Sequence, residues 1–257
     1  MQILNNLLPS PEQIKARSYF PRGLLQPQGS FRFSMDALLL SSFVKTKKDF
    51  HLLDIGAGCG VIGLALLSNN PSISVLGVDI DPALVDSAVK NAAMLGFENN
   101  FSAQEGDVGK IRTFLQPESF DLVVTNPPYR RINQGRLPEP PLRKNALFEG
   151  SGNLDSFIAG ATFALKNGGP FYFIYPAERL ADLFLSLTQH RLEPKIILPL
   201  QSTSNKDVDL LLLKAIKNGK PGLKIKKPLL LYKKEGGNVR LTKQALNFCP
   251  WLECNAK

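Results

Sequence analysis

The sequence contains few of the residues that support metal or disulfide chemistry. Histidine occurs only twice in 257 residues, at His51 and His190, which argues against a histidine-based metal site and leaves few candidate bases for a catalytic triad. The three cysteines, Cys59, Cys249 and Cys254, form neither a C-x-x-C metal pair nor a disulfide framework. We therefore expect no metal and a reducing, cytoplasmic setting.

Long apolar stretches are also missing. No run approaches the roughly 20 apolar residues that cross a membrane, so we expect no membrane association through a spanning helix. The first residues, M-Q-I-L-N-N-L-L-P-S, lack the charged region and apolar run of a signal peptide. The composition, 44% hydrophobic and 21% charged, is that of a folded globular protein with a substantial core.

The positive charge of the chain lies in its last quarter. Residues 1–194 carry 18 basic and 18 acidic side chains, whereas residues 195–257 carry 13 basic and 4 acidic ones, a net charge of +9. Lysines concentrate between Lys214 and Lys234. Such clustering is typical of a surface that binds a polyanion, although a lysine-rich surface that only keeps the protein in solution is an equally good explanation from charge alone.

Short apolar runs alternate with helical patterns, which predicts an α/β fold with a mostly parallel sheet. We expect a helix at Ser34–Phe43, with Ser34 as its N-cap, and an antiparallel hairpin at the sheet edge formed by Lys195–Leu200 and Val208–Ala215. The other expected strands are His51–Ile55, Ile73–Asp79, Phe101–Glu105, Phe120–Thr125, Pro170–Tyr175 and Leu229–Tyr232. The other expected helices are Val61–Ser68, Pro82–Leu95, Leu154–Leu165 and Ala177–Gln189. The remaining tail shows no clear pattern.

A glycine-rich turn, D-I-G-A-G-C-G at residues 54–60, lies between the first expected strand and its helix. Gly56, Gly58 and Gly60 let the backbone turn sharply and come close to a ligand, and the helix that follows presents free N–H groups. Residues 58–63, G-C-G-V-I-G, also match the dinucleotide pattern G-x-G-x-x-G, which keeps a nicotinamide dehydrogenase among the alternatives.

Three aspartates accompany the turn and favour a different ligand. Asp54 precedes the glycines, where a carboxylate suits an ammonium group better than a pyrophosphate. Asp79 ends the second strand, where an acid binds ribose hydroxyls, and Asp107 follows the third strand, where it could accept from the amine of an adenine. Together they predict S-adenosylmethionine as the cofactor, although each aspartate alone could be a helix cap or turn former.

The fourth expected strand is followed by N-P-P-Y at residues 126–129. The two prolines stiffen the turn, so that the side-chain oxygen of Asn126 and the carbonyl of Pro127 point in fixed directions. Both could accept hydrogen bonds from a planar amine and favour its pyramidal, nucleophilic form, while Tyr129 could stack on a flipped base. Methyl transfer to an amino nitrogen is the predicted chemistry, with no metal and no strong base required.

These two motifs, about 70 residues apart, resemble those of class I methyltransferases that modify amino nitrogens. Outside the motifs, Q-P-Q-G-S-F-R-F-S-M-D-A-L-L-L-S-S-F (26–43), R-L-E-P-K-I-I-L-P-L (191–200) and residues 211–232 resemble the bacterial tRNA adenine-N6-methyltransferases, which act beside the anticodon of a valine tRNA. The sequence departs from that family at residues 146–149, A-L-F-E, where relatives usually carry A-R-[HY]-E.

The resemblance implies a Rossmann-like seven-stranded sheet with helices on both faces and one antiparallel edge strand. Residues 1–48 would pack on the cofactor site, and residues 49–257 would form the methyltransferase domain with a basic region at about 206–243. It implies tRNA as partner, with no obligate protein partner. The implied cofactor residues are Phe33, Ser34, Asp54, Gly56, Gly58, Gly60, Asp79, Asp107 and Asn126. The implied catalytic residues are Asn126, Pro127 and Tyr129, and the implied RNA contacts are Pro128, Arg130, Arg131, Lys206, Lys224, Lys226 and Lys227.

Several other functions use the same features. Enzymes that methylate a release-factor glutamine have the same Asn-Pro-Pro-Tyr turn, but they usually carry a larger helical region ahead of the glycine turn than the 53 residues before Asp54 here. Amino methylation of ribosomal RNA also remains an alternative. A non-catalytic RNA-binding protein is disfavoured by the intact Asn126 and Tyr129, and a dehydrogenase by the lack of an evident hydride-transfer acid.

Overall fold

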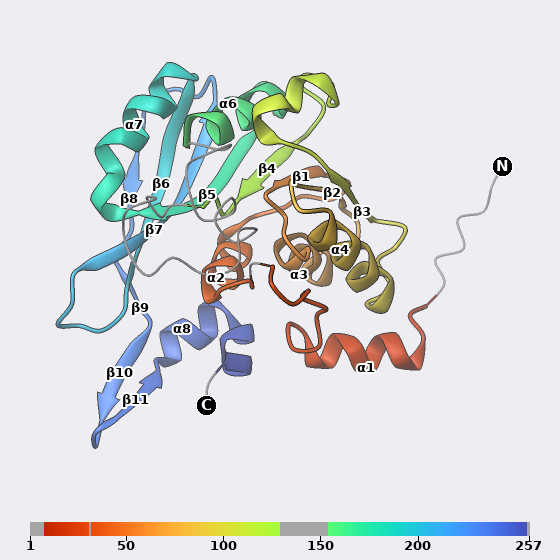
Figure 1. Cartoon of the computed structure of the whole chain (residues 1–257). Coiled ribbons are helices and arrows are strands. Elements are labelled where there is room, and N and C mark those ends of the chain that lie inside the picture. Colours follow the sequence, from red (N-terminus) through yellow and green to blue (C-terminus); the bar gives the residue numbers. More distant parts are fainter. Residues whose placement is uncertain (1–7, 31, 129–153, 256–257) are drawn as a thin grey trace.

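The computed structural model describes residues 8–30, 32–128 and 154–255. Its centre is a sheet in the order β3-β2-β1-β4-β5-β7-β6-β8, with β9 also paired to β6 (Figure 1). The strands are β1 (His51–Ile55), β2 (Ser74–Asp79), β3 (Phe101–Glu105), β4 (Leu122–Thr125), β5 (Pro170–Pro176), β6 (Leu192–Gln201), β7 (Val208–Lys217), β8 (Lys224–Ile225) and β9 (Leu229–Leu230). The predicted α/β class with a mostly parallel sheet is confirmed.

Helices cover both faces of this sheet (Figure 1). One face packs against α2 (Met35–Phe43), α3 (Val61–Asn69), α4 (Pro82–Met94) and α8 (Lys243–Phe248). The other face packs against α6 (Leu154–Ala164), α7 (Leu180–Gln189) and the short 3₁₀ helix η1 (Val108–Thr113). The two helix layers bury separate apolar clusters, and burial on both faces explains why the central strands are continuous apolar runs.

The antiparallel strand is not at the edge of the sheet, where the sequence predicts it. The expected pairing of residues 195–200 with 208–215 exists, but β7 lies between β5 and β6 and is antiparallel to both. The chain then returns past β6, where β8 and β9 form parallel pairs with it. With β8 and β9 the described sheet has nine strands, whereas seven were predicted. The two short strands cover the edge of β6 that would otherwise be open.

The tail, in which no clear sequence pattern is evident, is ordered. Strands β10 (Tyr232–Glu235) and β11 (Asn238–Leu241) form a hairpin that projects from the sheet (Figure 1), and α8 and the 3₁₀ helix η3 (Pro250–Asn255) follow. Thr242 caps α8 by accepting from the amide of Ala245 at 3.0 Å. Cys249 and Leu252 are fully buried in the α2–α3 layer, so the tail completes this part of the core.

The N-terminal part holds α1 (Pro11–Tyr19) against α4. Arg17 donates to the carbonyls of Leu95 and Gly96 and lies 4.3 Å from the centre of the Phe97 ring. Helix α2 begins after Ser34, the predicted N-cap, whose hydroxyl accepts from the amide of Asp36. The segment between these two helices is therefore fixed at both ends and lies beside the start of α4.

Candidate functional site

The carboxyl ends of β1, β2 and β4 meet at one edge of the sheet. Ile55 at the end of β1 is level with Val78 of β2 and Thr125 of β4 in the two parallel registers. The buried Thr125 hydroxyl donates a 2.6 Å hydrogen bond to the Ile55 carbonyl and so fixes the end of β4 against that of β1. In open α/β sheets this edge is where ligands bind. It is also where the predicted residues Asp54, Asp79 and Asn126 come together.

The glycine-rich turn is hydrogen-bonded to β2. The amides of Gly56 and Ala57 donate to the carbonyl of Val78 at 2.8 and 3.1 Å. Gly56 and Gly58 have φ angles of 73° and 57°, in the left-handed region where a Cβ causes strain. A Cβ on Gly58 would meet no described atom within 4 Å, so the backbone there is open to a ligand.

Gly60 and Gly63 serve the packing of α3 against the sheet. Gly60, with φ 85°, precedes the helix, and a Cβ on it would lie 3.0 Å from the Phe101 ring. A Cβ on Gly63 would lie 2.8 Å from both Phe101 and Val75. The sequence predicts Gly60 as a ligand contact, and the structure gives it a packing requirement. Gly63 is absent from the predicted site, although it belongs to the G-x-G-x-x-G pattern.

Asp54 is fully buried beneath this turn. Among the described residues neither of its carboxylate oxygens has a hydrogen-bond partner within the usual distance and angle limits. Its pKa is raised from 3.8 to about 7, chiefly by burial and to a smaller extent by the charge of Asp79, while the nearby backbone amide of Gly63 offsets part of the rise. A buried acid without a partner is costly, and a cation at the site would relieve that cost.

Asp79 has defined partners. Its carboxylate accepts from the amide of Gly58 at 2.7 Å and from that of Asp81 at 3.0 Å. Burial raises the pKa of Asp79, while these two amide hydrogen bonds lower it. The side chain therefore fixes the glycine turn and the entry to α4 at the same time.

Asp107 lies at the end of β3 and caps the following 3₁₀ helix. Its carboxylate accepts from the amide of Gly109 at 2.9 Å. The structure thus gives Asp107 the cap role that was the alternative to cofactor binding. The cap uses one carboxylate oxygen, and the second can accept from another donor. Contact with an adenine stays a prediction.

Asn126 follows β4 with its side-chain oxygen buried. Among the described residues this oxygen has no hydrogen-bond partner. Pro127 is buried and Pro128 half-buried, so the turn is held against the protein. An amide oxygen that is buried and unpartnered beside an open glycine turn is a position for a ligand N–H group. The predicted contacts Tyr129, Arg130 and Arg131, and the A-L-F-E segment at 146–149, lie outside the described residues.

The segment before α2 contacts the elements that carry the site. Ser30 donates to the carboxylate of Asp81 at 2.9 Å. Phe33 packs on the α2–α3 layer, and its amide donates to the side chain of Gln26. Ser34 has a cap role at α2, and direct contact of Phe33 or Ser34 with a cofactor stays a prediction.

Asn91 connects this segment to the glycine turn and is absent from the predicted site. It is fully buried in α4 and makes three hydrogen bonds. Its oxygen accepts from the amide of Leu25 at 2.7 Å, and its amide nitrogen donates to the carbonyls of Leu25 at 3.1 Å and Cys59 at 3.0 Å. An asparagine within an apolar helical pattern was the available signal.

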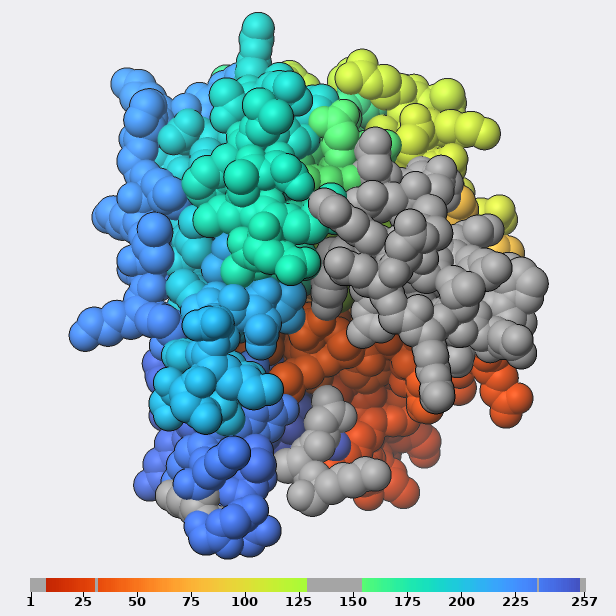
Figure 2. All heavy atoms as spheres, turned by 60° about the vertical axis from the view of Figure 1, so that its left-hand side comes forward, coloured from red at the N-terminus to blue at the C-terminus, as the bar shows by residue number. Residues whose placement is uncertain are grey.

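The predicted RNA-contacting lysines are exposed, and three of them, Lys224, Lys226 and Lys227, lie away from Asn126. Lys206, in the loop between β6 and β7, and Lys224, Lys226 and Lys227, in and after β8, belong to the C-terminal region along one side of the molecule (Figure 2, blue). Strand β8 is four positions from β4 in the sheet order, roughly 20 Å at about 5 Å per strand. Lys224, Lys226 and Lys227 could therefore bind only distant parts of a large ligand.

The described ranges contain neither a metal-binding group nor a membrane span. Residues 8–30, 32–128 and 154–255 contain no group of three or more side chains that could hold a metal ion. No helix within these ranges is long and apolar enough to span a bilayer.

Comparison with known proteins places this geometry in a family. The family model described as a methyltransferase domain matches residues 46–216. The fold is similar to a predicted O-methyltransferase from Agrobacterium tumefaciens, with a TM-score of 0.68, 21% identity, and coverage of 84% of this chain and 96% of that one.

Among curated proteins, the chain is similar to a tRNA1(Val) (adenine(37)-N6)-methyltransferase from Porphyromonas gingivalis, with 31% identity over 63% of this chain and 64% of the relative. It is also similar to a release factor glutamine methyltransferase from Xylella fastidiosa, with 37% identity over 46% of this chain and 44% of that protein. The match thus spans less than two thirds of each of these two relatives. The family model covers more than half of the chain, and the chain belongs to the methyltransferase domain family.

Proposed function

We propose that this protein transfers a methyl group from S-adenosylmethionine to the exocyclic N6 of an adenine in tRNA, near the anticodon. The observation that carries the proposal is the buried side-chain oxygen of Asn126, which has no partner among the described residues, at the edge of the sheet that also holds Asp54 and the glycine turn. The tRNA1(Val) methyltransferase of Porphyromonas gingivalis, to which the chain is similar, supports the choice of substrate.

The residues around the glycine turn fit S-adenosylmethionine. The carboxyl of Asp54, which no described residue pairs, suits the cationic end of this molecule, and the open backbone at Gly58 allows close approach. The remaining lone pairs of Asp79 can accept from ribose hydroxyls. S-adenosylmethionine, when bound, supplies an electrophilic methyl group. The protein's task is then to hold the acceptor nitrogen in line with it.

Asn126 would prepare that nitrogen. The amino group of adenine is a weak nucleophile because its lone pair is delocalised into the ring. Hydrogen bonds from its two N–H groups to the Asn126 oxygen and the Pro127 carbonyl would favour the pyramidal form with a localised lone pair. Because the hydrogen bond of Thr125 to Ile55 fixes the start of this turn, the acceptors are oriented before the substrate arrives.

An RNA substrate agrees with the charge distribution. The net charge of +9 over residues 195–257 provides affinity for phosphates without sequence preference. Specific RNA recognition usually targets unstacked bases in loops, and an anticodon loop offers such a base. A tRNA substrate would place the reaction in the cytoplasm, as the cysteine usage predicts.

The test is methyl transfer from labelled S-adenosylmethionine to unmodified total tRNA, followed by digestion and chromatography of the nucleosides. Label in N6-methyladenosine would support both the reaction and the acceptor. Cofactor binding without label in tRNA would overturn the tRNA substrate, and a protein that binds no S-adenosylmethionine would overturn the enzymatic function itself.

A protein glutamine is the second candidate acceptor. It is favoured by the Xylella fastidiosa relative, a release factor glutamine methyltransferase 37% identical over 125 residues. A carboxamide nitrogen has a delocalised lone pair as well, so the same Asn126 chemistry would serve it. Incubation with purified release factors and with ribosomal RNA in parallel with tRNA separates the three acceptors in one labelling experiment.

A further inference from the structure

Lys214 lies on the face of the sheet that α2 covers, and the charges of Lys47 and Lys195, from two other segments, act on it. Lys214 of β7 pairs with Ile196 of β6, the residue after Lys195. The β6–β7 register is irregular between Pro194 and Ile196, at Lys195. The Lys214 ammonium lies 5.5 Å from the centre of the Tyr172 ring. The backbone of Lys45, two residues before Lys47, comes close enough to the hydroxyl of Tyr172 to offset part of the rise that burial causes in its pKa. We refer to Lys47, Lys195 and Lys214 as the lysine cluster.

The lysine cluster is a concentration of positive charge without an acid bound to it. Burial lowers the pKa of Lys214, and the charges of Lys47 and Lys195 lower it further. Within the described residues none of the three lysines forms an ion pair with an acid. This includes Glu193, which precedes Lys195 by two residues in β6. Like charges held this close repel one another, and an anion between them would remove that repulsion.

Local contacts hold the lysines in place. Lys195 donates from its ammonium to the carbonyl of Lys220 at 2.7 Å. The Lys47 ammonium lies 6.0 Å from the centre of the Phe50 ring, and its backbone carbonyl accepts from the side chain of Asn70. The contact with Lys220 joins the cluster to the exposed basic segment around Lys224.

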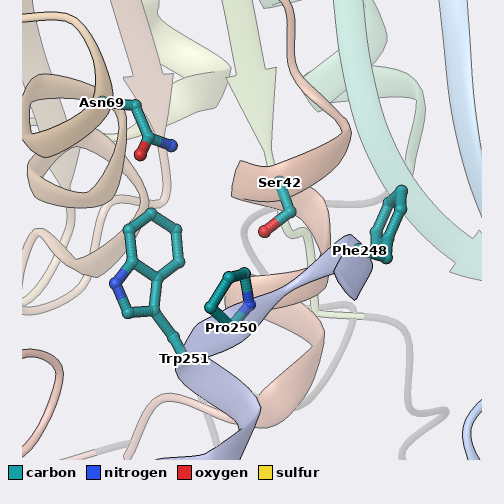
Figure 3. A pocket seen from close by; sticks show the side chains of 5 residues that line it. All are labelled: Ser42, Asn69, Phe248, Pro250 and Trp251. Atoms are coloured by element: carbon teal, nitrogen blue, oxygen red, sulfur yellow. The ribbon is translucent and has the colours of Figure 1, made fainter. Parts of the chain in front are cut away.

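An aromatic pocket lies at the C-terminal end of α2, close to the lysine cluster. Figure 3 shows Asn69 and Trp251 on one side and Phe248 on the other, with Ser42 and Pro250 between them. Its volume is about 220 Å³, below the roughly 300–1,000 Å³ of typical small-molecule sites, which suits a single planar group. Asn70, the residue after Asn69, donates to the hydroxyl of Thr46 and to the carbonyl of Lys47. These hydrogen bonds connect the pocket to the backbone of the lysine cluster.

These features match the chemistry of single-stranded RNA. Fixed ammonium groups bind backbone phosphates, aromatic rings stack on bases, and an exposed carboxamide can bond to a base edge. We propose that the lysine cluster holds phosphates of the RNA substrate while the aromatic pocket receives an unstacked base of the same strand. The inference rests on the proposed function and adds a second docking surface to it.

Helix α2 relates this surface to the cofactor site. Its first turn follows the segment that Asn91 connects to the glycine turn at Cys59, whereas Ser42 lies in its last turn at the aromatic pocket. Nine residues of helix span about 13 Å at 1.5 Å per residue. This length is short compared with a tRNA. An RNA that places its target adenine at Asn126 could therefore place another of its nucleotides at the aromatic pocket.

The first test compares tRNA binding by the wild type and by the double variant Lys47→Gln/Lys214→Gln over a range of salt concentrations. Because the variant removes two ammonium groups that would bind phosphates, we expect the Kd for tRNA to rise about tenfold at low salt and the slope of log Kd against log salt to become shallower by about 1.4. The Tm should not fall, because the change removes like-charge repulsion. Lys110→Gln, in the exposed 3₁₀ helix on the opposite face, is the matched control and should change neither quantity.

The second test uses Trp251, which is the only tryptophan of the chain and therefore an intrinsic probe. A short single-stranded RNA should quench its fluorescence, whereas inorganic polyphosphate, which has no bases, should not. Absence of quenching by an RNA that binds would overturn the base pocket, and unchanged tRNA affinity and salt slope in the double variant would overturn the lysine cluster. If the wild type still forms N6-methyladenosine, either result leaves the proposed function intact. A wild type that neither binds nor methylates RNA overturns both.

Discussion

The backbone amide of Gly58 donates a 2.7 Å hydrogen bond to the carboxylate of Asp79, so the glycine turn after β1 is fixed by the residue that ends β2. The other oxygen of Asp79 accepts from the amide of Asp81 at the start of α4. One half-buried acid thus connects the turn to the next βα unit. In the proposed complex Asp79 would also bind the cofactor, so its loss should change both the shape of the glycine turn and the affinity for the cofactor.

The variant Asp79→Ala should raise the Kd for S-adenosylmethionine about tenfold or more, since it removes charge-assisted hydrogen bonds to the ligand and loosens the turn. Isothermal titration measures this affinity directly. Asp86→Ala provides the control, because Asp86 lies on α4 in an exposed pair with Lys90. Equal affinity of Asp79→Ala and wild type would exclude Asp79 from the cofactor site.

The variant Asn126→Ala should abolish methyl transfer while the Kd for S-adenosylmethionine stays within about twofold of wild type, because in the proposed mechanism the lost amide oxygen binds the acceptor amine. Single-turnover transfer to tRNA and cofactor titration on the same preparation give both values. Turnover close to that of the wild type would remove Asn126 from the mechanism.

The strands were predictable where local sequence alone decides them. β1 and β3 have the predicted bounds, because each is a short run that turn-forming residues end. The position of β7 between β5 and β6 was not predictable in the same way, since strand order depends on which edge is free when the chain returns. The tail also escaped prediction. Its helix α8 depends on a cap at Thr242 and on burial of Cys249 against distant residues.

The site divides in a similar way. That Asp54, Asp79 and Asn126 lie at one edge of the sheet was predictable, because the carboxyl ends of parallel strands meet there. Asn91 was not, because its partners Leu25 and Cys59 lie 66 and 32 residues away in the chain. The lysine cluster was not predictable either, because Lys47 lies in the neutral range 1–194 and Lys195 and Lys214 lie in the basic range 195–257.

Cofactor affinity should depend on pH through Asp54. Its pKa is raised to about 7 by burial, so the neutral acid dominates below that pH and the carboxylate above it. A cationic ligand prefers the carboxylate, and the Kd should therefore fall as the pH rises from about 5.5 to 7.5, below the pKa of about 8 of an α-amino group. Asp54→Asn should bind more weakly and lose this pH dependence.

The same pKa has a consequence for stability without ligand. Because the folded state holds the Asp54 proton more tightly than the unfolded chain, Asp54 contributes stability below about pH 4 that is lost as the pH rises through about 7. The Tm of the wild type relative to that of Asp54→Asn should fall over this range. A constant difference would show that Asp54 does not titrate there.

The triple variant Lys224→Glu/Lys226→Glu/Lys227→Glu should weaken tRNA binding and flatten its salt dependence while cofactor affinity stays unchanged. These side chains are exposed at the outer strand of the sheet, away from the glycine turn, so reversal of their charge acts on RNA phosphates alone. Filter binding at several salt concentrations is the measurement. Unchanged tRNA affinity would assign these lysines to solubility.

The variant Asn91→Ala should lower both stability and cofactor affinity. It leaves the part-buried amide and carbonyl of Leu25 and the buried carbonyl of Cys59 without their partner, and the loss of three hydrogen bonds should cost about 3 kcal/mol of folding free energy. Because Cys59 belongs to the glycine turn, the KM for S-adenosylmethionine should rise several-fold while kcat is largely kept.

Asn100→Ala is the matched control for Asn91. Asn100 makes one side-chain hydrogen bond, to the carbonyl of Ile73 at the far end of β2, so its loss should cost about 1 kcal/mol and leave the KM unchanged. Urea unfolding and initial rates separate the two effects. If Asn91→Ala lost stability but kept a wild-type KM, the contact between the N-terminal segment and the turn would serve folding alone. A raised KM in Asn91→Ala only would mean that residues before α2 help to shape the cofactor site.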